Sequence, residues 1–144
     1  MDTQKYVIRQ ISIFSENRPG RLAAIAHALG EEKINILAFS IAEANGFGVV
    51  RALVDHPEKA FEKLQALGFN VAFTDVIAVH MKDQPGGLYE VAKILGDSGI
   101  NIEYSYAYSG KEGAVLILRV DQVSEAIKKV QSVGVTLLER SVFH

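Results

Sequence analysis

The sequence of 144 residues contains no cysteine. This absence excludes disulfide bonds, thiolate metal sites and cysteine nucleophiles. An excess of basic residues is also missing, because 15 Lys and Arg stand against 17 Asp and Glu and the formal net charge is −2. A general nucleic-acid-binding protein needs a basic surface to neutralise phosphates, so the composition argues against that class of protein.

Long apolar runs are absent as well. No run approaches the length of a membrane span, and the first five residues lack the apolar core of a signal peptide, so we expect a soluble, cytoplasmic protein. The four histidines show no metal-ligand spacing, and no nucleophile is accompanied by a base and an orienting partner. We therefore expect no metal site, no catalytic residues and no enzyme.

The sequence contains one short motif twice. Residues 17–22, NRPGRL, return as residues 83–88, DQPGGL, 66 positions later, and each copy is followed by Ile-Asn-Ile, at 34–36 and 100–102. Residues 11–78 align with residues 77–144 at this offset without a gap, and many of the pairs are identical or exchange one apolar residue for another. Repetition at one fixed offset indicates an internal duplication.

Each copy predicts the order strand, helix, strand, strand, helix, strand. Apolar residues at i, i+3, i+4 and i+7 give each helix one buried face, for example Leu22, Ile25, Ala26 and Leu29. Pro19 and Pro85 are placed where helices begin, and glycines where they end. We expect strands at 7–14, 36–42, 49–54, 71–81, 102–108, 114–120 and 137–143.

This order predicts an α+β fold of two tandem ferredoxin-like βαββαβ units, each an antiparallel sheet with both helices on one face. We place domain 1 at 1–73 and domain 2 at 74–144. The last strand of one copy and the first strand of the next overlap in the run 71–81, without a Gly/Pro linker. We expect either one long strand shared by the two sheets or a strand exchanged between the units.

The Pro-Gly loops have a chemistry that suits a ligand. Each leads into a helix N-terminus, where unpaired N–H groups and the helix dipole favour an anion such as a carboxylate. The Asn17 amide can donate to a carboxylate or accept from an ammonium, whereas ionised Asp83 can only accept. Asn35 and Asn101 offer further donors and acceptors, so the groups suit a free amino acid. The alternative is that these asparagines form Asx turns, cap helices or satisfy loop backbone.

The run SENRPGRL at 15–22, the helix after it and Ile-Asn-Ile at 34–36 resemble the ACT domain family, and are especially similar to the regulatory domain of phosphoglycerate dehydrogenase. The second copy is similar to the same pattern, so the resemblance covers essentially the whole chain as two ACT domains. It implies that the domains pair and bind a small molecule, usually an amino acid, at their interface. It also implies that the loop asparagine, the loop glycine and an asparagine of the partner domain line that site.

Carried onto this sequence, the resemblance implies ligand-binding roles for Asn17, Gly20 and Asn35 in one copy and for Asp83, Gly86 and Asn101 in the other. Because Asp83 replaces an asparagine, we expect the two sites to be unequal. No cofactor is expected beyond a free amino acid as effector. The full predicted set comprises Asn17, Arg18, Pro19, Gly20, Arg21, Leu22, Asn35, Ile36, Asp83, Gly86, Gly87, Leu88, Asn101 and Ile102.

Aromatic residues supply further candidates. Tyr104, Tyr106 and Tyr108 alternate along one strand and therefore share one face of the sheet. They either pack at a subunit or domain interface or line a ligand pocket. Tyr89, early in a helix, is placed to reach a pocket near Gly86.

The leading functional hypothesis is an amino-acid-binding regulatory protein, acting as a homodimer and influencing a partner in trans. The alternative is a regulatory subunit of an amino-acid biosynthetic enzyme or a small transcriptional co-regulator. An enzyme on the same scaffold is the third reading, because fold alone does not determine function. Groups that recognise an amino-acid backbone hold every amino acid alike, so the sequence does not identify the ligand.

Overall fold

The computed structural model describes residues 3–111 and 113–144, and the chain divides into two compact units. The N-terminal unit consists of Arg9–Thr74 together with Phe143–His144. The C-terminal unit consists of the described residues of Asp75–Val142 together with residues 3–8. The division after Thr74 lies one residue beyond the boundary predicted from the sequence, and each terminal segment is grouped with the other repeat.

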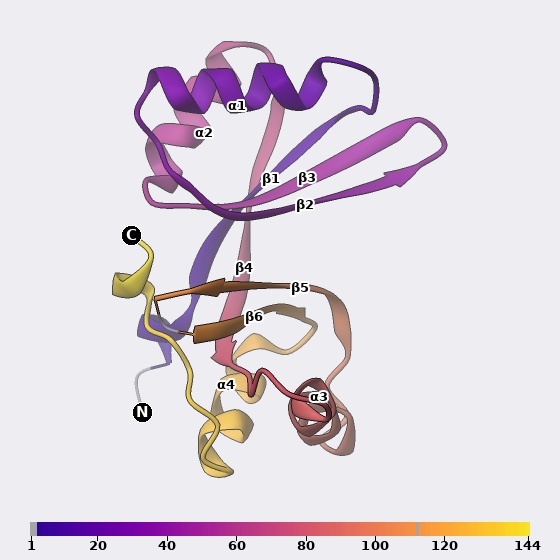
Figure 1. The fold of residues 1–144 in the computed structure, drawn as a ribbon, viewed down its shortest axis with the longest axis vertical. Helices are drawn as coiled ribbons and strands as arrows, with labels where there is room; N and C mark the ends of the chain where they lie inside the picture. The colour runs from indigo at the N-terminus through magenta and orange to yellow at the C-terminus, as the bar shows by residue number, and fades with distance from the viewer. Residues whose placement is uncertain (1–2, 112) are drawn as a thin grey trace. The chain divides into compact units, whose positions relative to one another are not determined.

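The N-terminal unit has the hydrogen-bonded strand order β2-β3-β1-β4. The pairs β1–β3 and β2–β3 are antiparallel, and a hydrogen bond of 2.9 Å between the Ser12 and Thr74 hydroxyls links β1 to β4. Both helices lie on one face of this sheet (Figure 1). Its elements are β1 (Ile8–Glu16), α1 (Arg21–Glu31), β2 (Ile36–Ala44), β3 (Phe47–Val54), α2 (Pro57–Ala66) and the start of β4 (Asn70–His80).

The C-terminal unit repeats this arrangement with the order β4-β6-β5, again antiparallel. Leu137 adds a single antiparallel bridge to Val79 of β4. Its elements are η1 (Gln4–Tyr6), the rest of β4, α3 (Gly87–Asp97), β5 (Ile102–Gly110), β6 (Gly113–Val120), α4 (Val123–Ser132) and η2 (Arg140–Val142). The prediction of two tandem ferredoxin-like units is therefore confirmed.

The strand predicted at 137–143 is wrong beyond its first two residues. Backbone hydrogen bonds from His80 N–H to the Thr136 carbonyl and from Leu138 N–H to the Ala78 carbonyl begin a strand, which then gives way to η2. In the N-terminal unit the corresponding stretch of β4 buries Phe73 against the core, but Glu139 occupies that position here. The Arg140 guanidinium donates instead to the carbonyls of Val7 and Gln4, which draws the chain away from the sheet edge.

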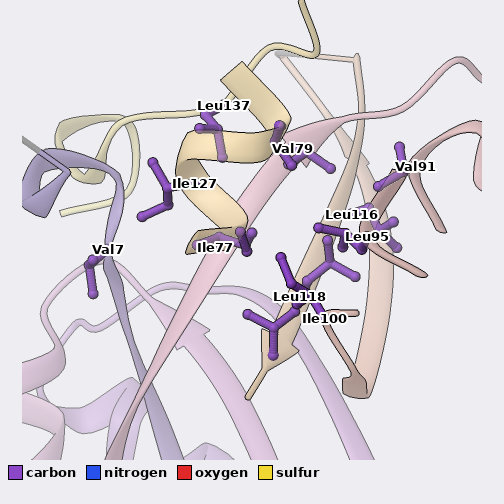
Figure 2. Close-up of a cluster of buried hydrophobic side chains, with 13 residues drawn as sticks. Val7, Ile77, Val79, Val91, Leu95, Ile100, Leu116, Leu118, Ile127 and Leu137 are labelled. Atoms are coloured by element: carbon purple, nitrogen blue, oxygen red, sulfur yellow. The ribbon is translucent and has the colours of Figure 1, made fainter. Parts of the chain in front are cut away.

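Each unit has its own hydrophobic core between sheet and helices. Figure 2 shows the core of the C-terminal unit, where Val91 and Leu95 of α3 meet Val79, Leu116 and Leu118 of the sheet. The N-terminal unit packs Ile25, Ala28 and Leu29 of α1 and Ala60 and Leu64 of α2 in the same way. None of the helices in the described residues is long and apolar enough to cross a membrane.

The buried faces of the helices are narrower than the sequence predicted. Leu22 and Leu88, in the first turns of α1 and α3, are 38% and 54% exposed, and Ala26 is exposed where Ala28 is buried. Leu67, just after α2, and Val133, just after α4, are also exposed. The apolar period of the sequence therefore continues beyond the residues that each helix buries against the sheet.

Candidate ligand-binding site

The loop between β1 and α1 borders a small pocket in the N-terminal unit. The pocket has a volume of about 20 Å³ and lies between the end of β1, the first turns of α1 and the β2–β3 hairpin. Three residues of the predicted set line it, Asn17, Arg21 and Leu22, together with Ile41 and Gly48. Arg18, Pro19 and Gly20 form the exposed turn beside it.

Gly20 gives this loop its shape. It is the N-cap of α1 with a φ of +90°, a left-handed conformation that glycine adopts readily, and Gly86 repeats it with a φ of +89°. Neither cap makes a side-chain hydrogen bond to the first turn. Pro19 and Pro85 thus precede the caps and do not occupy the first helical position that the sequence suggested.

The side-chain amide of Asn17 does not stabilise the loop that contains it. Its backbone N–H donates to the Gly46 carbonyl at 2.8 Å, which fixes the residue to the β2–β3 turn. The side-chain amide makes no hydrogen bond within the described part of the chain, so the Asx-turn and helix-cap alternatives are not what the structure shows. A Cβ built on Gly48 lies 3.3 Å from the Cβ of Asn17, so glycine at 48 leaves room for this side chain.

Arg21 is held across the pocket. Its Nε donates to the Ser15 hydroxyl at 3.0 Å, and its guanidinium carbon lies 5.5 Å from the centre of the Phe69 ring. This geometry fits a cation–π contact and still leaves guanidinium donors for a carboxylate. Arg18 is paired with Glu16 at 3.4 Å on the exposed side of the turn.

Asn35 lies at the opposite end of the same unit. The loop adjoins the end of β1, where Glu16 pairs with Phe47, whereas Asn35 precedes β2, whose first residue Ile36 pairs with Val54. Strands of this length separate the two ends by roughly 25 Å. Asn101 and Ile102 are likewise remote from Asp83 and Gly86 in the C-terminal unit. The structure therefore does not bring the loop and the second asparagine together within one unit.

Two aspartates that the sequence analysis did not assign hold these asparagines in place. The Asp55 carboxylate accepts from the Asn35 N–H at 2.9 Å, and the Asp121 carboxylate accepts from the Asn101 N–H at 3.0 Å. The N–H of each aspartate donates in return to the carbonyl of its asparagine at 3.2 Å. The sequence contained a sign of this role, because both copies have an aspartate at this position, Asp55 in the first and Asp121 in the second.

We expect replacement of Asp121 by alanine to lower the free energy of unfolding by about 1 kcal/mol, because a charge-assisted hydrogen bond at an exposed site is lost. Urea unfolding measures this difference. Asp121→Asn retains an acceptor oxygen and is the matched control, for which we expect a smaller loss. An unchanged free energy of unfolding in Asp121→Ala would show that this hydrogen bond contributes nothing.

The second copy of the loop differs from the first. Asp83 and Gly86 are exposed, and Gly87 stands where the first copy has Arg21. Gly87 is buried and lines a larger hollow that also includes Tyr89, as considered from the sequence. The two loops therefore present different groups to a ligand, with an arginine and an amide in one and a carboxylate in the other.

The three strand tyrosines lie on the sheet face that is turned away from α3 and α4. Tyr106 pairs with Ile117 and Tyr108 with Val115, whereas the residues that contact the helices, such as Leu116, have the opposite parity. All three tyrosines are partly buried. In the part of the chain that the structure describes, no three His, Cys, Asp or Glu side chains are grouped as a metal site would require.

Comparison with known proteins agrees with this architecture. The family model described as the ACT domain pair matches residues 6–138. A Bacteroides thetaiotaomicron protein of known crystal structure is 34% identical, with 96% of each chain covered and a TM-score of 0.90. No match was found among curated protein sequences.

Two regulatory subunits of aspartate kinase share the fold. The ligand-free subunit from Thermus thermophilus is 17% identical, with 92% of this chain and 96% of that chain covered and a TM-score of 0.66. The subunit from Thermus flavus is also 17% identical, with 86% and 90% covered and a TM-score of 0.56. The family match spans nearly all of the described residues, the N-terminal unit has the expected βαββαβ order, and the C-terminal unit has it up to the single bridge at Leu137, so the chain belongs to the ACT domain pair family.

Proposed function

We propose that the protein is an amino-acid-sensing regulatory module whose ligand is held at the loop of the N-terminal unit. The observation that carries the proposal is the convergence of three groups at one pocket: the unpaired amide of Asn17, the guanidinium of Arg21 and the first turn of α1. The guanidinium and the helix N-terminus favour a carboxylate. An amide oxygen accepts from an ammonium, so the groups together match a zwitterion.

The size of the pocket supports a site completed by a second copy of the chain. A volume of about 20 Å³ holds little more than one water molecule, whereas small-molecule sites usually measure about 300–1,000 Å³. Two residues of the pocket lining are exposed and apolar, Leu22 at 38% and Ile41 at 43%, and Phe39, two residues before Ile41 on β2, is 50% exposed. A partner covering this surface would enclose the ligand and contribute an asparagine from the distant end of its own sheet. The protein is accordingly proposed to act as a homodimer.

A thermal-shift screen of the twenty amino acids tests the proposal. Ligand that binds only the folded state stabilises it, by about 2.7 kcal/mol at a hundred times the dissociation constant. We expect one or a few amino acids to raise the melting temperature by several degrees. We further expect Asn17→Ala to remove this shift without unfolding the protein, because alanine keeps the Cβ that faces Gly48.

Asp83→Ala is the matched control, since it changes the corresponding position of the other repeat. We expect it to leave the shift unchanged. Absence of a shift with all twenty amino acids, or an undiminished shift in Asn17→Ala, would contradict the proposal. Bulky substitutions at Gly20 are a poor test of binding, because the left-handed backbone there strains any other residue.

The output of the sensor is proposed to pass through a partner enzyme or regulator. The regulatory subunits of aspartate kinase that share the fold show that paired units of this kind occur as separate regulatory chains. Affinity purification of the tagged chain, with and without the amino acid found in the screen, tests this step. An enzyme retained only in one of the two states supports it, and purification of the homodimer alone in both states opposes it.

A further inference from the structure

A large groove in the C-terminal unit shares no lining residue with the loop pocket described above. This groove has a volume of about 620 Å³, within the range of small-molecule sites. Three segments line it: residues 80–82 at the end of β4, the first two turns of α3, and residues 133–136 after α4. Its walls are mainly apolar, with Met81, Val91 and Val135 among them.

The internal repeat shows what normally fills this place. In the N-terminal unit, the Arg21 guanidinium spans from the Ser15 hydroxyl to the face of the Phe69 ring. At the repeat offset, Ser15 corresponds to Met81, Arg21 to Gly87 and Phe69 to Val135, and all three of these counterparts line the groove. The groove is therefore the space that an aromatic ring and a guanidinium occupy in the other repeat.

The rim of the groove carries one aromatic and two ammonium side chains that the first copy lacks at the corresponding positions. Tyr89, Lys82 and Lys93 stand where the first copy has Ala23, Glu16 and His27. Lys82 is paired with Glu90 at 3.5 Å and Lys93 with Asp97 at 3.0 Å, both on the surface. Exposed ion pairs of this kind are weak, so both ammonium groups can engage a ligand anion.

We propose that this groove binds a small aromatic carboxylate. The ring takes the place that Phe69 fills in the N-terminal unit, against Val135 and beside Tyr89. The carboxylate lies at the rim, between the ammonium groups of Lys82 and Lys93. The two lysines are the groups of the lining that attract an anion, and the exposed pairs that they make with Glu90 and Asp97 are weak enough to exchange for a ligand carboxylate. This site does not depend on the amino-acid site proposed above.

Titration of the protein with phenylacetate, followed by backbone amide NMR, tests the proposal. We expect shifts at residues 80–94 and 133–136 that saturate at millimolar concentrations, and none at residues 17–25. Phenylacetamide, which has the ring without the charge, and acetate, which has the charge without the ring, are each expected to bind at least tenfold more weakly.

Val135→Phe restores the residue of the first copy and is expected to weaken phenylacetate at least tenfold by filling the groove. Leu67→Phe, which adds the same ring to an exposed position of the N-terminal unit, is its control and should change nothing. Tyr89→Ala alters a side chain that is 65% exposed, so it reports on the groove even if Val135→Phe unfolds the chain, and we expect a loss of at least threefold. Shifts centred on residues 17–25, no saturable shifts, or unchanged affinity in folded Val135→Phe or in Tyr89→Ala would overturn the proposal. An amino-acid response at the loop alone would leave the proposed function standing without it.

Discussion

Replacement of Gly87 by alanine is expected to destabilise the protein by about 3 kcal/mol, although the same position of the first repeat carries an arginine. A Cβ built on Gly87 would overlap the backbone carbonyl oxygen of Lys82. Backbone cannot rotate away as a flexible side chain can, so the β4–α3 loop must shift or the first turn of α3 must unwind. Thermal unfolding measures the effect, expected as a fall of roughly 10 °C in the melting temperature.

The two loops differ in structure, which explains why position 21 carries a side chain and position 87 cannot. In the second copy the Gln84 N–H donates to the Lys82 carbonyl at 2.9 Å, and this hydrogen bond has no counterpart in residues 16–21 of the first copy. The Lys82 carbonyl that accepts this hydrogen bond is the one that faces Gly87. Arg21 meets no such carbonyl, and its side chain extends across the pocket to Ser15.

Gly96→Ala is the matched control for Gly87→Ala, since it makes the same change in the same helix. Nothing lies within 4 Å of a Cβ built there, and Gly96 is in the last turn of α3. Alanine is the better helix former, so we expect a gain of about 0.5–1 kcal/mol. If both variants unfold at the same temperature, the close approach of Lys82 to Gly87 has no energetic importance.

The duplication made most of the fold predictable. One copy supports the assignment of the other, and the strands expected at 36–42 and 49–54 are joined by a hairpin turn at Asn45 and Gly46, with φ values of +54° and +84°. The predicted strand at 137–143 is wrong because the two copies diverge there. Its residues align with 71–77 of the first copy, which form a strand, but they do not share the same side chains. Two charged residues, Glu139 and Arg140, stand where the start of β4 has Phe73 and Thr74, so the apolar alternation that holds that strand is lost.

The two candidate sites were predictable to different degrees. The loop site rests on residue types that are present, so the sequence indicated Asn17 and Arg21 directly. The groove results from what is missing, namely the side chains that Gly87 and Val135 do not supply. A cavity formed by smaller residues leaves no positive signal in a single sequence; comparison of the repeats gave only the exchange of Arg21 for Gly87 and the suggestion that Tyr89 reaches a pocket.

The surface beside the loop site is also asymmetric between the repeats. In the N-terminal unit, Phe39 and Ile41 are exposed apolar residues of β2, which is an edge strand, and Leu22 of α1 lines the same pocket as Ile41. The register pairs Phe39 with Ala52 and Ile41 with Val50, so both lie on the helix side of the sheet. The corresponding strand residues of the other repeat are Ser105 and Ala107. The larger apolar side chains of Phe39 and Ile41 are suited to burial by a second copy, whereas Ser105 and Ala107 offer little apolar area.

Replacement of Ile41 by lysine is therefore expected to dissociate the proposed homodimer. The change removes apolar area from the interface and places a charge there, which costs about 2 kcal/mol, or roughly a 30-fold weaker dimer. Sedimentation velocity across a concentration series measures the dissociation constant. Because the pocket beside Ile41 is too small to enclose an amino acid alone, the thermal shift should disappear at the concentrations where the variant is monomeric. Ala107→Lys makes the matching change on β5 and should alter neither quantity. A variant that dissociates yet keeps its full ligand response would place the amino acid within a single chain, and equal dissociation by both lysines would move the interface away from β2.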